Sequence, residues 1–264
     1  MTQRSPAGTP NGVDFPEPRP TNATTPTRVL VLIANALGNL VTVTLCHGHY
    51  ETRHALSDGD VAAALGDWEP QLALIDIDHF PKGIEQVGGG MAQGGIPILG
   101  FTRRRDTKVK LNAYEQGADD IVEVPFTLDE IVARPYALIR RSLGINVRIV
   151  PKILLGGRLE IDLMEQTVRM DGGPQLDLTP TQQTLLYLLA ANAGEVLTRE
   201  QLLDSLWGSA FQIESNVVDR HIRELRVKLG DDWRTPRYLE TIPGKGYRFS
   251  GKNGIAPASA TAAD

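Results

Sequence analysis

The sequence predicts an α/β doubly wound domain followed by a smaller α+β domain, and three observations support this. Continuous apolar runs at 29–33 and 72–75 are typical of parallel strands buried on both faces. Two threonine capping boxes, 179–182 and 198–201, begin helices in the second half. A basic amphipathic helix is predicted at 218–229, and a glycine-rich hairpin follows it.

The first half, residues 27–144, alternates strand-like and helix-like patterns. Shorter strand candidates follow the long apolar runs, at 96–101 and 120–123. This alternation favours a doubly wound, flavodoxin-like sheet, in which functional groups gather at the carboxyl ends of the strands. Asp76 and Thr102 lie at two such ends.

The second half places a basic helix beside a hairpin. On the helix at 218–229 the aliphatic residues form one stripe, and Arg220 and Arg223 point to the opposite side. The hairpin at 238–249 carries Lys245 at its tip. Such a helix can enter the major groove of DNA while the hairpin reaches the backbone or minor groove. Either element alone would fit a solvated surface, but together they predict a winged helix-turn-helix domain.

Residues 153–250 resemble the DNA-binding domain of OmpR/PhoB-type response regulators. The matching segments are Leu178–Thr181, Leu197–Leu203, Leu206–Gly208, Val218–Asp219, His221–Arg223 and Gly244–Phe249. In that family the third helix reads the major groove, and the loop at 209–214 here would contact RNA polymerase. The resemblance assigns DNA contact to Asn216, Arg220, His221, Arg223, Glu224, Arg226, Lys228, Lys245 and Arg248.

Three departures from the family favour a second hypothesis for this domain. Asn216, Glu224 and Pro243 stand where the family usually has basic residues, so Lys245 must supply the positive charge of the wing. A protein-interaction adaptor with a winged helix that does not bind DNA therefore stays open as an alternative.

Residues 27–144 resemble the receiver domain of the same regulators. Gln71–Asp76 matches the strand that ends in the phosphoacceptor aspartate, and Phe101–Thr102 matches the switch threonine. A working receiver also has an acidic pair after its first strand, to hold Mg²⁺, and a lysine before a proline. Here Ile33–Ala34 and Val124 occupy those places.

These losses predict an atypical receiver. A single carboxylate without the lysine supplies neither a magnesium cage nor a fixed cation, and Asp78 is a weak substitute. We expect Asp76 to be structural, hydrogen-bonded to local backbone or to Thr102, and control to be independent of phosphorylation. The alternative is a conventional two-component phosphorelay in which a histidine kinase phosphorylates Asp76.

A homodimer is expected through the last helix of the receiver, near 128–143. The resemblance assigns the interface to Lys108, Asp119, Asp120, Glu130 and Arg134. An interior proline, Pro135, should kink that helix. A solvated charged helix face is the alternative.

The single cysteine suits a cytoplasmic protein, but the mildly acidic composition of the whole chain is not typical of a protein that binds duplex DNA. The 264 residues carry a net charge of −5, but residues 219–248 hold 8 Lys/Arg against 5 Asp/Glu, which concentrates positive charge where phosphate contact is expected. Cys46 is the only cysteine, which excludes an internal disulfide. No apolar run approaches the ~20 residues that span a bilayer.

The remaining segments predict no further chemistry. Cys46–His49, with His54 nearby, suggests a metal site, but histidines on an ordinary surface are favoured. We expect no cofactor, no metal and no catalytic centre. Residues 1–26 and 251–264 read as a disordered leader and tail, with a linker at 145–152.

Overall fold

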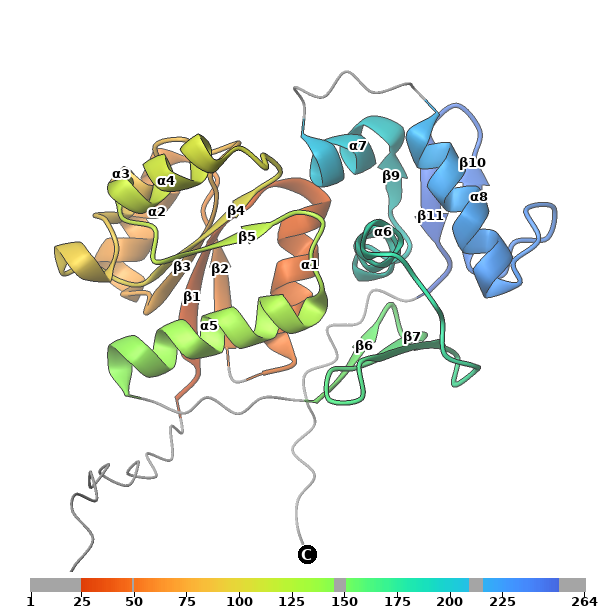
Figure 1. Ribbon diagram of the computed structural model, residues 1–264, viewed down its shortest axis with the longest axis horizontal. Helices are drawn as coiled ribbons and strands as arrows, with labels where there is room; N and C mark the ends of the chain where they lie inside the picture. Colours follow the sequence, from red (N-terminus) through yellow and green to blue (C-terminus); the bar gives the residue numbers. More distant parts are fainter. Residues whose placement is uncertain (1–24, 49, 145–150, 209–215, 252–264) are drawn as a thin grey trace, which may run out of the picture.

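The first domain is a five-stranded parallel sheet in the order β2-β1-β3-β4-β5, with helices on both faces (Figure 1). The computed structural model describes residues 25–48, 50–144, 151–208 and 216–251. The elements of this domain are β1 (Thr27–Leu32), α1 (Asn35–Cys46), β2 (Tyr50–His54), α2 (Asp58–Ala63), η1 (Ala64–Trp68), β3 (Leu72–Asp76), α3 (Gly83–Val87), η2 (Met91–Gln93), β4 (Ile98–Thr102), α4 (Thr107–Gln116), β5 (Asp120–Glu123) and α5 (Leu128–Leu143). The predicted doubly wound fold is confirmed.

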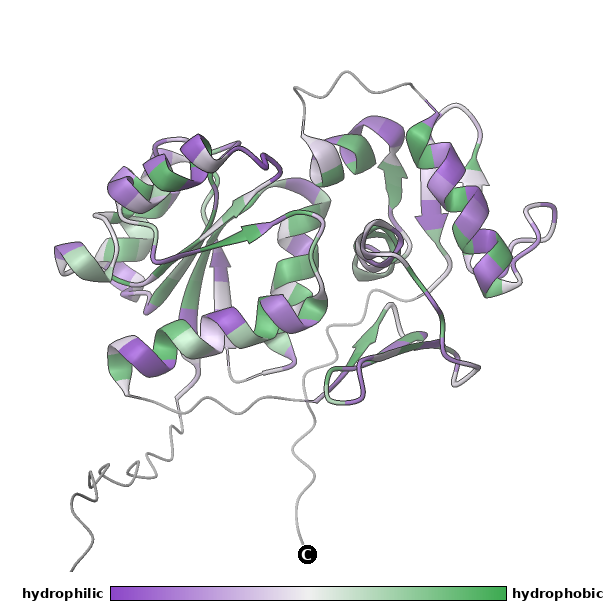
Figure 2. Ribbon diagram, viewed as in Figure 1, coloured by the Kyte–Doolittle hydropathy of each residue, from purple (hydrophilic) through white to green (hydrophobic). Residues whose placement is uncertain are grey.

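The strands of this sheet are apolar on both faces because each face is covered. Along β1, Val29 and Val31 pack with α1 and α5, whereas Leu30 and Leu32 pack with residues of α2, α3 and α4. Figure 2 shows the resulting hydrophobic colour along the central strands. The continuous apolar runs in the sequence follow from this two-sided burial.

The second domain is a winged helix-turn-helix, as predicted. Its elements are β6 (Lys152–Leu155), β7 (Leu159–Asp162), β8 (Thr167–Met170), α6 (Pro180–Ala191), β9 (Val196–Thr198), α7 (Arg199–Trp207), α8 (Val217–Leu229), β10 (Leu239–Ile242) and β11 (Gly246–Phe249). Strands β6, β7 and β8 form one antiparallel sheet, and the β10-β11 hairpin pairs with β9 in another. Thr179 and Thr198 make the two predicted capping boxes, which begin α6 and α7.

The two domains share one apolar core along α1, which lies between the parallel sheet and α6 (Figure 1). Asn39 Nδ2 donates to Asn192 Oδ1 at 2.7 Å, and Thr184 Oγ1 donates to the carbonyl of Phe126 at 2.9 Å. The buried residues of the two domains therefore form one continuous cluster at this boundary. The reason is that α1 carries no charged residue, so both of its sides favour burial.

Helix α5 continues through Pro135 from Leu128 to Leu143, and Pro135 is buried on its inner side. The proline removes one backbone donor without ending the helix. The predicted leader (its first 24 residues), the linker residues 145–150, the loop at 209–214 and most of the predicted tail lie outside the described residues. No helix in the described part of the chain is long and apolar enough to cross a bilayer.

Candidate DNA-binding surface and receiver site

Helix α8 has the amphipathic form that the sequence predicts. Val218, Ile222 and Leu225 are buried against the rest of the domain. Gly230 adopts a left-handed conformation, with φ of 61°, and ends the helix. The opposite side of α8 is polar and faces outward (Figure 2).

Three of the residues predicted to contact DNA have exposed cationic side chains that are not committed elsewhere. Arg220 and Arg223 are exposed on the outer side of α8, and Lys245 is exposed at the tip of the β10-β11 hairpin. Among the described residues, none of these three side chains has a hydrogen-bond or ion-pair partner. They are available for guanine edges or phosphates.

Three other predicted residues already hold the domain together. Arg226 Nη2 donates to the carbonyl of Leu239 at 2.6 Å and thereby links α8 to β10. Lys228 Nζ donates to Gln182 Oε1 at 2.9 Å, and Arg248 Nε donates to a Glu240 carboxylate oxygen at 2.9 Å. DNA contact by these three residues stays a prediction.

The rest of the predicted set lies at the start and middle of α8. Asn216 is exposed at the N-cap of α8, and Glu224 is exposed but accepts a hydrogen bond from Gln182. His221 is half-buried and stacks on Trp207, with 5.9 Å between the ring centroids. Burial lowers the pKa of His221 despite the nearby Glu224, so its imidazole is neutral at pH 7. It packs against Trp207 of α7, and its contact with DNA stays a prediction.

A three-residue contact that sequence reasoning missed positions α8 against the wing. Asp219 Oδ1 accepts from Arg199 Nε at 2.7 Å and from the Tyr247 hydroxyl at 2.6 Å. Arg199 also lies over the Tyr247 ring, 5.0 Å from its centroid. The contact joins α7, α8 and β11, and it thereby fixes the orientation of helix α8 relative to the β10-β11 hairpin.

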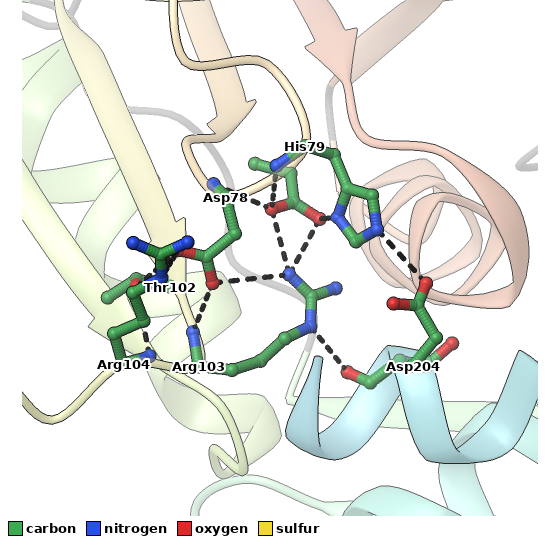
Figure 3. Close-up of polar contacts among 8 residues, drawn as sticks. Asp78, His79, Thr102, Arg103, Arg104 and Asp204 are labelled. Atoms are coloured by element: carbon green, nitrogen blue, oxygen red, sulfur yellow. Dashed lines mark hydrogen bonds and ion pairs between the residues drawn. The ribbon is translucent and has the colours of Figure 1, made fainter. Parts of the chain in front are cut away.

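Asp76, the last residue of β3, lies in a buried ion-pair network with Arg103 and His79, two residues that Figure 3 labels. Arg103 Nη1 lies 2.8 Å from each carboxylate oxygen of Asp76, and His79 Nδ1 lies 2.9 Å from Oδ2. The side chains of Asp76 and Arg103 are 1% and 3% exposed. The backbone N–H groups of Asp78 and His79 also donate to Asp76, at 3.2 and 3.3 Å.

One expectation for this site is wrong, and another holds in only one of its two forms. The fixed cation that Val124 cannot provide is supplied by Arg103, which follows β4 directly. Thr102 does not bind Asp76, because its hydroxyl donates instead to Asp78 Oδ1 at 3.0 Å. The expected contact of Asp76 with local backbone is confirmed.

The network also sets the charge states of Asp76 and His79. Burial alone would raise the pKa of Asp76, but the hydrogen bond from His79 and the charge of Arg103 together hold it below its usual value. The hydrogen bond to Asp76 raises the pKa of His79, more than desolvation lowers it, and Asp204 adds to the rise. Both groups are thus stabilised in their charged forms.

The same network binds the second domain. His79 Nε2 lies 3.0 Å from Asp204 Oδ2, and Arg103 Nε donates to the carbonyl of Ser205 at 3.1 Å. Both partners belong to α7, so this helix covers the Asp76 site (Figure 3). Sequence reasoning missed the roles of His79, Arg103 and Asp204, although the position of Arg103 immediately after a strand end was a usable signal.

The predicted dimer residues make contacts within this chain. Arg134 Nη1 binds both carboxylate oxygens of Asp120, and its Nη2 donates to Glu130 Oε1 at 2.8 Å. Asp119 accepts from the backbone N–H of Ile98 at 2.8 Å, and Lys108 is exposed on α4. Their part in a dimer stays a prediction.

The histidines near Cys46 make separate local contacts. His47 Nδ1 lies 2.7 Å from the carbonyl oxygen of Val43, and His54 Nε2 lies 2.8 Å from Thr42 Oγ1. His49 lies outside the described residues. In the described part of the chain, no group of three His, Cys, Asp or Glu side chains is arranged to hold a metal ion.

Comparisons with known proteins agree with both domains. Residues 173–249 match the family described as transcriptional regulatory protein, C terminal. The chain is 32% identical over 202 residues to the transcriptional regulatory protein KdpE of Mycobacterium tuberculosis, an alignment that covers 76% of this chain and 88% of KdpE. The phosphate regulon regulator PhoB of Pseudomonas aeruginosa is 34% identical over 81% of this chain and 93% of its own length.

The chain belongs to the OmpR/PhoB family of DNA-binding response regulators. Among solved structures, the OmpR/PhoB homologue DrrB of Thermotoga maritima is 25% identical to it. That alignment covers 86% of this chain and all of DrrB, with a TM-score of 0.36. Within this OmpR/PhoB regulator, Arg220, Arg223 and Lys245 are the exposed candidates for DNA contact, and the role of Asp76 as the phosphoacceptor position stays a prediction.

Proposed function

We propose that this OmpR/PhoB-family protein is a sequence-specific regulator of transcription that binds double-stranded DNA and is controlled without phosphorylation of Asp76. The DNA-binding part is supported by the exposed cationic side chains of Arg220, Arg223 and Lys245 on the helix and wing. The regulatory part rests on one observation, the contact of Arg103 with both oxygens of Asp76.

The contact of Arg103 with Asp76 opposes phosphoryl transfer for a physical reason. A phosphodonor must reach a carboxylate oxygen of Asp76, but this side chain is 1% exposed and both of its oxygens already accept hydrogen bonds. Cations normally neutralise the charge that develops in this reaction. Here the cation is already neutralising the carboxylate, so transfer would first have to break a buried ion pair.

The proposal also covers the binding partners of the protein and its location in the cell. We propose that two copies bind an operator as a homodimer, in the cytoplasm where the chromosome is found, and that the segment 209–214 contacts RNA polymerase. A histidine kinase is not needed for this mode of control. The conventional phosphorelay remains equally consistent with family membership.

Selection of bound genomic fragments, followed by gel shift, tests the proposal. The full chain should retain specific fragments, and their affinity should be the same with and without acetyl phosphate and Mg²⁺. Failure to bind any fragment would favour the adaptor hypothesis. Tighter binding only in the presence of the phosphodonor would favour the phosphorelay.

A further inference from the structure

A cleft lies between the two domains, immediately beside the Asp76 site. The receiver lines one side with Arg104, Arg105 and Pro125, and the DNA-binding domain lines the other with Thr181, Leu206 and Trp207. Its volume is about 480 Å³, within the range of about 300–1,000 Å³ typical of small-molecule sites. Domain boundaries are frequent places for such sites.

The polar lining of the cleft favours an anion. Arg105 is exposed in the cleft and has no ion-pair or hydrogen-bond partner for its side chain among the described residues. The side chain of Arg104 is 59% exposed and lies 3.4 Å from Asp78, the one acidic residue among the described residues that line the cleft. Arg103 is already neutralised by Asp76. The two outer arginines therefore leave a surplus of positive charge at the cleft.

The apolar lining favours a flat ring. Trp207 is half-buried and lines the cleft, and its indole stacks on His221 at an interplanar angle of 20°. Val124, Pro125 and Leu206 also line the cleft, Val124 and Leu206 from largely buried positions. Aromatic and aliphatic walls with a few polar groups are typical of sites for organic molecules.

We propose that this cleft binds a small aromatic anion, a planar ring that bears a carboxylate or a phosphate, and that the bound molecule holds the two domains in their docked arrangement. The anionic group pairs with Arg105 and Arg104, and the ring lies against Trp207. Binding to the cleft is independent of the proposed function, whereas any effect on DNA affinity rests on it.

A ligand that touches both domains shifts the equilibrium between docked and undocked forms, because it binds only the docked one. The interface between the docked domains contains unsatisfied polar atoms, which make such a shift easier. Asp204 Oδ1 and the Ser205 hydroxyl are buried in α7 without hydrogen-bond partners in the described structure, which weakens docking. The stack of Trp207 on His221 connects the cleft wall to the helix that carries Arg220.

Fluorescence of the full chain tests the binding step with 1-anilinonaphthalene-8-sulfonate, an aromatic anion, as the probe. We expect energy transfer from tryptophan to the bound probe. Most of it should be lost in Trp207→Phe, the residue that lines the cleft, and kept in the matched control Trp233→Phe, since Trp233 is exposed on another surface. Arg105→Ala should weaken binding at least about fivefold, and Arg141→Ala, an exposed arginine on α5, should not change it. Equal binding by Arg105→Ala and the wild type would overturn the proposal.

Competition identifies the chemistry of the ligand. Salicylate and adenosine monophosphate, an aromatic carboxylate and a heteroaromatic phosphate, should displace the probe, and the stronger competitor identifies the preferred anionic group. Displacement by inorganic phosphate at the same concentrations would indicate a site for simple ions and overturn the aromatic requirement. A gel shift without competitor tests the proposed function separately, and the competitor should then change DNA affinity in the wild type but not in Arg105→Ala.

Discussion

Replacing Arg103 with alanine should destabilise the protein by leaving Asp76 buried without its cation. Removing one partner of a buried ion pair costs about 3–5 kcal/mol. His79 and two backbone N–H groups still bind the carboxylate, so we expect a loss near the lower end, about 3 kcal/mol at pH 7. Urea unfolding of the full chain measures this loss, and Arg105→Ala, on the exposed neighbour, should change stability by less than about 0.5 kcal/mol.

The pH dependence of the loss follows from the pKa of Asp76. In the wild type this pKa is lowered, so the contribution of Asp76 to stability is present above the unfolded pKa and is lost as the pH falls through the folded one. Without Arg103, burial should raise the pKa of Asp76. The variant should therefore recover part of its stability, relative to the wild type, as the pH falls from about 7 to about 5.

A double variant isolates the buried charge. Arg103→Ala with Asp76→Asn removes the unpaired carboxylate, and we expect it to regain about half of the stability that the single variant loses. The reasoning is refuted if Arg103→Ala loses less than about 1 kcal/mol at pH 7, or if the double variant is as unstable as the single one.

Three further predictions concern docking and DNA binding. Because the pKa of His79 is raised, its ion pairs stabilise docking fully below the unfolded pKa of about 6.5, and this stabilisation is lost as the pH rises through the folded pKa. Energy transfer between dye labels on the two domains measures docking, and His79→Gln should abolish its pH dependence. A pH profile that is unchanged in His79→Gln would contradict the assignment. Arg220→Ala and Arg223→Ala should each weaken specific DNA binding by about 1–3 kcal/mol in gel shifts, with Arg141→Ala as the neutral control, and normal binding by the double variant would contradict the predicted face. Lys245→Ala should weaken binding to all sequences alike and reduce the salt dependence of log Kd by about one unit, whereas an unchanged slope would mean that the wing does not touch DNA.

The sequence predicted those parts of the fold that depend on local pattern. The apolar runs of β1 and β3 and the capping boxes of α6 and α7 are decided by neighbouring residues, so they could be recognised without a structure. The same holds for the exposed arginines of α8, whose orientation follows from helical periodicity.

The contents of the Asp76 site depend on residues far apart in the chain. His79 and Asp204 are 125 positions apart and meet only because α7 docks on the receiver. The arginine that replaces the missing lysine comes from the end of β4, whereas the family pattern directed attention to Val124. The charge-free sequence of α1 was the one local signal that both of its sides are buried.

Intact-protein mass spectrometry after incubation with acetyl phosphate and Mg²⁺ tests the central claim most directly. The account predicts no phosphoryl adduct on the wild-type chain, the same result as for Asp76→Asn, because Arg103 and His79 occupy both oxygens of the carboxylate. A stoichiometric adduct on the wild type that is absent from Asp76→Asn would contradict the account and restore the conventional phosphorelay.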